Sequence, residues 1–228
     1  MADGRISSSS AEIEEFCSNN GYHFLCADWY SRGDSSGKLA DATLTRWTDD
    51  IINLLDRCAP DVKGGMGGTK AIFVGAGVGV WVAVLVALKR PDLARGLVGI
   101  GGDPDFTEDL LWKELPEETK EEIMTKGFKE ITWGRFNAVY PVTSGLIEDG
   151  RKNLVLRGGP KSLPITCPVR LIHCINDDEV PVETSMKLAE CMQSQNCVIS
   201  MPKDGLNSKA INRAIEQCIE FTQDYDVN

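Results

Sequence analysis

The feature that most constrains the fold is an apolar stretch, residues 71–88, which glycines interrupt near its start. The turn over residues 75–79 has the sequence GAGVG and lies between a short apolar run and a longer one that ends before a proline. A membrane helix requires about 20 uninterrupted apolar residues, whereas glycines at this spacing favour a sharp turn. The stretch therefore predicts a strand, a turn and a helix, and no transmembrane segment.

An alternation of strands and helices extends this pattern along the chain. The periodicity predicts helices near residues 9–20, 41–57, 78–90, 186–192 and 211–219. Short apolar runs predict strands at residues 24–29, 71–74, 96–100, 169–174 and 198–201. Strands that alternate with helices predict an α/β fold with a mostly parallel sheet and helices on both faces.

The domain organisation follows from the absence of repeats and low-complexity linkers. We expect residues 1–228 to form a single domain that carries one insertion. The alternation breaks at about residues 103–168, hereafter the cap segment, where helix signals cover residues 107–115 and 116–126. Aromatic residues of this segment, among them Phe106 and Trp112, would either pack the cap onto the core or line a ligand pocket, and packing is the favoured interpretation.

Charge and cysteine content limit the partners and the compartment. The chain has 34 acidic and 24 basic residues, a formal net charge of −10, which disfavours binding to nucleic acid. Its eight cysteines form no C-x-x-C pair, so we expect reduced, mostly buried thiols, with no metal or other cofactor. The amino-terminal sequence MADGRISSSSAEIEEF resembles neither a signal peptide nor a transit sequence, which predicts a cytoplasmic protein.

The glycine turn allows two functional interpretations. A dinucleotide-binding turn of the type G-x-G-x-x-G needs glycine or alanine where Val80 stands, which argues against a nucleotide site. A nucleophile elbow, G-x-S-x-G, presents a reactive serine between strand and helix. Gly75 and Gly79 keep this frame, but Gly77 stands at the position of the serine and has no side chain that could attack a carbonyl.

Several segments resemble α/β-hydrolase serine esterases, namely residues 27–37, 75–81, 167–173, 177 and 180–181. Within that superfamily the chain is similar to the palmitoyl-protein thioesterase and acyl-glucuronide esterase group, whose animal members form a mitochondrial branch. This similarity extends to residues 104–118 and 145–150. The resemblance implies an α/β-hydrolase fold over nearly the whole chain, in which an early central strand has no counterpart.

The resemblance also implies where a catalytic triad would lie. Its positions are occupied by Gly77, Asp177 and Asn207, where the family has a serine, an acid and a histidine. An amide cannot accept a proton near neutral pH, so two of the three groups are lost. The backbone N–H of Val78 is the remaining expected donor of an oxyanion hole. A ligand pocket beneath the cap is expected to include Val80, Trp81, Phe106 and Trp112.

Loss of the nucleophile and the base predicts a catalytically inactive esterase or thioesterase homologue that binds a small hydrophobic or acyl-like ligand or a protein partner. Two alternatives stay open. Cys174, beside His173 and near Asp177, could serve as a substitute nucleophile, although neighbouring strand residues point to opposite faces and His173 is expected to be structural. The missing strand could leave a sheet edge through which a partner or a second copy docks.

Overall fold

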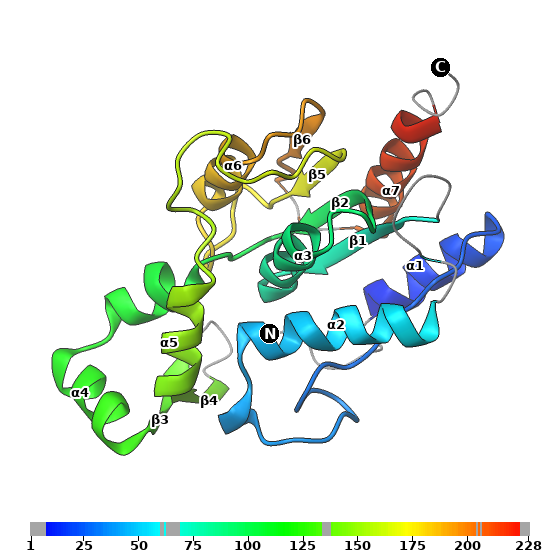
Figure 1. The fold of residues 1–228 in the computed structure, drawn as a ribbon. Coiled ribbons are helices and arrows are strands. Elements are labelled where there is room, and N and C mark those ends of the chain that lie inside the picture. Colours follow the sequence, from blue (N-terminus) through cyan, green and yellow to red (C-terminus); the bar gives the residue numbers. More distant parts are fainter. Residues whose placement is uncertain are drawn as a thin grey trace.

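A parallel sheet forms the centre of the computed structural model, which describes residues 8–59, 62, 69–133, 138–203, 205 and 207–223. The sheet has the strand order β1-β2-β5-β6, with bounds β1 (Ala71–Ala76), β2 (Ala94–Ile100), β5 (Val169–Ile172) and β6 (Cys197–Ser200). All neighbouring pairs are parallel. Parallel strands need helical crossovers, and Figure 1 shows these helices on both sides of the sheet. The predicted fold class is confirmed.

Two hydrophobic clusters cover the two faces of the sheet. One contains Phe73 and Leu97 and packs under the helices α2 (Leu44–Cys58), α3 (Val78–Lys89) and α6 (Val182–Cys191). The other contains Val98 and Ile100 and packs under α1 (Ser8–Asn19) and α7 (Ser208–Gln223). Neighbouring strand residues point to opposite faces, so one strand supplies both clusters. In the described part of the chain, none of the helices combines the length and the apolar character needed to span a membrane.

The strand predicted at residues 24–29 is absent, which corrects the expected number of strands in the sheet. The backbone over residues 22–29 has no regular secondary structure, and Leu25 is 44% exposed. A strand needs a neighbouring backbone for its hydrogen bonds, and among the described strands β1 pairs with β2 alone. The strand that leads into the glycine turn is therefore an edge of the described sheet.

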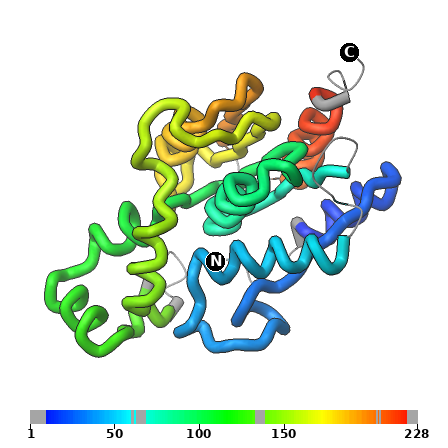
Figure 2. Tube along the Cα trace, viewed as in Figure 1, coloured from blue at the N-terminus to red at the C-terminus, as the bar shows by residue number. Residues whose placement is uncertain are grey.

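The cap segment connects β2 to β5 and extends from one end of the sheet (Figures 1 and 2). Its elements are η2 (Thr107–Leu111), η3 (Trp112–Glu114), α4 (Glu117–Lys126), β3 (Phe128–Trp133), β4 (Ala138–Thr143) and α5 (Ser144–Lys152). The two predicted helical regions are present, whereas the antiparallel β3-β4 hairpin was not predicted. The hairpin contains runs rich in aromatic and β-branched residues, which are typical of strands.

Two carboxylates hold the cap segment in place. Asp105 is fully buried, and its two oxygens accept hydrogen bonds from the backbone N–H groups of Val155 (2.8 Å) and Leu156 (3.0 Å). Asp149, on α5, accepts hydrogen bonds from the backbone N–H and the hydroxyl of Thr45 at the start of α2 (2.9 and 2.7 Å). The first contact closes the base of the cap, and the second joins the cap to a core helix.

Candidate active site

The turn between β1 and α3 has the backbone geometry that a nucleophile elbow requires. Gly77 has φ 53° and ψ −126°, a region that residues with a side chain rarely adopt. A β-carbon on Gly75 would collide with the carbonyl oxygen of Gly79, so the strand and the helix approach too closely for another residue. The N–H of Gly77 donates to the carbonyl oxygen of Ile100 on β2 (3.0 Å). The elbow is therefore formed, although its central residue has no functional group.

The residues after Gly77 are part of the core. Val78 is the first residue of α3, which places its N–H at a helix N-terminus, as expected for an oxyanion-hole donor. Val80 and Trp81 are fully buried, and the Trp81 indole donates to the carbonyl oxygen of Asn153 (2.8 Å). The ring of Phe106 meets Trp81 edge to face, with centroids 5.8 Å apart. These aromatic side chains pack against each other and against the cap.

Trp112 lies on the cap segment, in the short helix η3. It is partly buried against the same hydrophobic cluster, and the guanidinium of Arg151 lies over its ring, 4.8 Å from the centroid. A cation over an aromatic face is a stabilising contact within the cap. The four residues expected in a ligand wall thus belong to, or pack against, one hydrophobic cluster, and none of them lines the pocket described below.

Asp177 follows β5 and orders the loop that leads to α6. Its Oδ1 accepts hydrogen bonds from the backbone N–H groups of Glu179 (2.9 Å) and Val180 (3.0 Å). Nε2 of the fully buried His173 lies 3.8 Å from Asp177 Oδ2 and 2.9 Å from the carbonyl oxygen of Val180. Because a carbonyl only accepts, Nε2 carries a proton, and Nδ1 lies 2.7 Å from the hydroxyl of Ser185. His173 is therefore held as a structural residue.

Asn207 and Cys174 make contacts that do not suit proton transfer. Asn207 is exposed, and its Oδ1 accepts a hydrogen bond from the backbone N–H of Ala210 (2.9 Å), which caps the start of α7. The Cys174 thiol donates to the carbonyl oxygen of Lys203 (3.5 Å). A peptide carbonyl cannot remove the proton of a thiol, so this contact does not activate Cys174.

Asp103 is a site residue that the sequence analysis missed. A β-carbon built on Gly77 would lie 4.0 Å from each carboxylate oxygen of Asp103, and the backbone N–H of Asp103 donates to the carbonyl oxygen of Gly77 (3.5 Å). Its Oδ1 is buried and has no hydrogen-bond partner in the described part of the chain. Burial, aided by the nearby charges of Asp177 and Glu179, raises the pKa of Asp103 to about 7. Its position just after β2, where ligands of parallel sheets bind, was the available signal.

Comparisons with known proteins show which proteins this chain is similar to in sequence and in fold. The mouse (Mus musculus) mitochondrial palmitoyl-protein thioesterase ABHD10 is 31% identical over 195 residues, which cover 85% of this chain and 61% of that protein. The solved structure of mouse α/β hydrolase domain-containing protein 10 matches with a TM-score of 0.80 and 26% identity, over 96% of this chain and 86% of that one. The chain belongs to the α/β-hydrolase superfamily. No protein-family model matches the chain.

The same comparisons correct the predicted location. The human (Homo sapiens) palmitoyl-protein thioesterase ABHD10, 29% identical over 84% of this chain and 59% of its own length, is also named as mitochondrial. The chain spans about three fifths of the length of these relatives. The cytoplasmic prediction is wrong, because the location of the relatives points to mitochondria and outweighs a judgement from amino-terminal composition alone.

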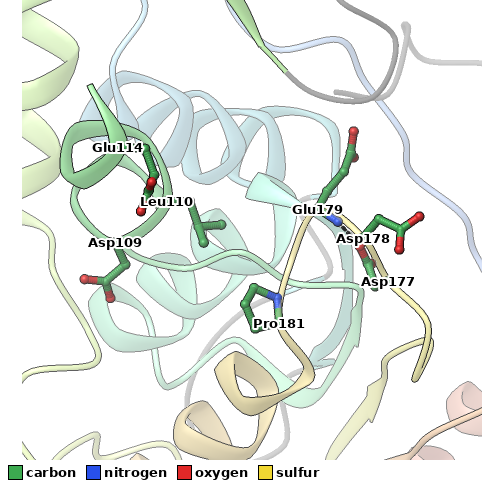
Figure 3. Close-up of a pocket in the computed structure, with 7 residues that line it drawn as sticks. All are labelled: Asp109, Leu110, Glu114, Asp177, Asp178, Glu179 and Pro181. Carbon is green, nitrogen blue, oxygen red and sulfur yellow. Dashed lines mark hydrogen bonds between the residues drawn. The ribbon is translucent and has the colours of Figure 1, made fainter. Parts of the chain in front are cut away.

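A pocket of about 430 Å³ lies between the cap and the loop that contains Asp177. Figure 3 shows that its lining comes from these two segments: Asp109, Leu110 and Glu114 from the cap, and Asp177, Asp178, Glu179 and Pro181 from the loop. Five of the seven are acids, and Arg157 pairs with one of them, Asp109 (2.6 Å). Within the described ranges, no cluster of three or more His, Cys, Asp or Glu could hold a metal ion.

Proposed function

We propose that this protein does not carry out acyl transfer through a serine and that it binds a small ligand in the pocket between the cap and the Asp177 loop. Gly77 carries the proposal, because the central residue of a formed elbow has no atom that could bond to an acyl carbon. Asn207 adds support, since its amide caps a helix and cannot act as the base.

The lining of the pocket indicates which ligand chemistry suits it. A volume of about 430 Å³ is in the range of small-molecule sites. Acids surround the pocket, while Val80 and Trp81 are packed in the core and provide no apolar wall. The proposed ligand therefore carries hydrogen-bond donors at one end, which suits this pocket better than a purely hydrophobic or acyl-like molecule.

A protein partner is the second candidate, and the position of β1 supports it. Among the described strands β1 pairs on one side only, and Val74 on this strand is 37% exposed. An edge strand can add a strand from another chain. Light scattering would test this candidate, since a monomer at all concentrations would argue against self-association through β1.

The proposal is tested by incubating the unmodified protein with an octanoyl thioester. Hydrolysis is measured as the release of the free thiol. We expect no turnover above that of the heat-denatured protein. A Cys174→Ala variant is the matched control, because turnover that disappears in this variant would support the alternative of a cysteine nucleophile. Turnover that survives in Cys174→Ala would contradict the proposal and require another nucleophile.

Ligand binding is tested separately with two probes that differ in one end group. Octylamine presents hydrogen-bond donors and a positive charge, whereas octanoate presents a carboxylate. We expect octylamine to raise the melting temperature more than octanoate does, and Asp177→Asn to reduce this difference. Equal effects of both probes would contradict the proposed ligand chemistry.

A further inference from the structure

The space in front of Gly77 is bounded by the carboxylate of Asp103. Both carboxylate oxygens lie 4.0 Å from the point where a β-carbon of residue 77 would be. A hydroxyl on that β-carbon would project further and come within hydrogen-bond distance of the carboxylate. Oδ1 of Asp103 has no partner in the described part of the chain, so it is available to accept such a bond.

We propose that Asp103 is a third determinant, beside Gly77 and Asn207, that closes this elbow to acyl transfer: its carboxylate borders the space of a nucleophilic side chain and, when ionised, adds negative charge to the site where the oxyanion would develop. This inference rests on the proposed function and specifies which residues produce it. The sequence comparison with serine esterases identifies only the other two positions, because Asp103 belongs to a different loop.

The physical reason is the demand that acyl transfer makes on the charge of the site. The transition state places negative charge on the former carbonyl oxygen, and the helix N-terminus at Val78 would stabilise it. Above its pKa of about 7 the Asp103 carboxylate is charged, and it then opposes that stabilisation because little water screens the two charges. It would also accept the hydrogen bond of a serine hydroxyl at position 77 and turn it away from a base.

A serine hydroxyl at position 77 serves as a probe of the contact with Asp103. Gly77→Ser and Gly77→Ala experience the same backbone strain and differ only in the hydroxyl, so we compare them with Asp103 present and in Asp103→Ala. With Asp103 present, we expect Gly77→Ser to be more stable than Gly77→Ala, because its hydroxyl can bond to the carboxylate. In the Asp103→Ala background, the ratio of the unfolding constant of the alanine variant to that of the serine variant should be about tenfold smaller. Equal ratios in both backgrounds would overturn the proposal.

Chemical reactivity gives the second measurement. Gly77→Ser/Asn207→His restores the two family residues, and we compare its labelling by a fluorophosphonate with that of the same protein carrying Asp103→Ala. Labelling is expected to be at least tenfold faster without the carboxylate. Glu130→Ala, which removes an exposed acid from the cap hairpin, is the charge-matched control and should not change the rate.

Each remaining outcome decides the question. Equal labelling with and without Asp103, or no labelling in either protein, would contradict the proposal. The proposal requires that removal of the carboxylate makes the serine at position 77 reactive. If Asp103→Ala does not fold, Asp103→Asn keeps the shape of the side chain and takes its place. Thioester turnover by the unmodified protein would contradict the proposed function and leave this comparison between variants valid.

Discussion

The base of the cap and the elbow contain two aspartates that are two positions apart in the chain and have opposite surroundings. Asp105 at the base of the cap is fully buried, and backbone N–H groups occupy both of its oxygens. Asp103 at the elbow has a buried oxygen without a partner in the described structure. Burial raises the pKa of both carboxyls, to about 7 for Asp103. The difference indicates that donors, rather than burial, distinguish a structural carboxylate from one that affects the chemistry of a site.

The largest expected effect concerns the pH dependence of stability. Asp103 has a pKa of about 7 in the folded protein against 3.8 in the unfolded chain, so the folded state binds the proton more tightly. Its contribution to stability is complete below pH 4 and is lost as the pH rises through 7. Relative to Asp103→Asn, the unfolding free energy of the unmodified protein should fall by about 4 kcal/mol between these pH values.

Urea unfolding of both proteins at several pH values checks this prediction. The comparison between the two proteins cancels the other titrating groups. A constant difference across the range would mean that the pKa of Asp103 is the same in the folded and the unfolded protein, which would contradict the effect of its burial.

The second prediction concerns Asp105 itself. Asp105→Ala leaves the N–H groups of Val155 and Leu156 buried without acceptors, which should cost about 3 kcal/mol of unfolding free energy. Asp109→Ala is the matched control, because Asp109 pairs with Arg157 at the surface and should cost about 0.5 kcal/mol. Equal losses in the two variants would remove the structural role given to Asp105.

The smallest effect concerns the helix cap at the position of the lost histidine. Asn207→Ala removes the acceptor for the backbone N–H of Ala210, and we expect a loss of about 1 kcal/mol. Asn207→Asp keeps an acceptor at the same place and should unfold near the urea midpoint of the unmodified protein. If Asn207→Ala is as stable as the unmodified protein, capping of α7 is not the reason that an asparagine occupies this position.

The sequence predicted those elements whose signals are local. The glycine turn and the apolar helix after it were predicted because side-chain size and periodicity alone determine them. Residues 24–29 have the composition of a strand, but a strand also needs a partner, which composition cannot supply. The β3-β4 hairpin was missed because the helix signals around it dominated the interpretation of the cap.

The candidate site shows the same limit at the level of single residues. Gly77 and Asn207 were identified by position within a motif, which sequence carries directly. Asp103 was not, because its importance depends on the loop after β2 placing a carboxylate opposite the elbow. Its missing hydrogen-bond donor is likewise a property of the folded chain.

The close contact between Gly75 and Gly79 has a consequence for protein engineering. These two flanking residues and the hydrogen bond from the N–H of Gly77 to Ile100 maintain the shape of the turn. The side chain of the central residue is not needed for that shape. The chain is therefore a scaffold with a vacant reactive position, in which serine, cysteine or aspartate could be installed at residue 77 once the neighbouring carboxylate is neutralised.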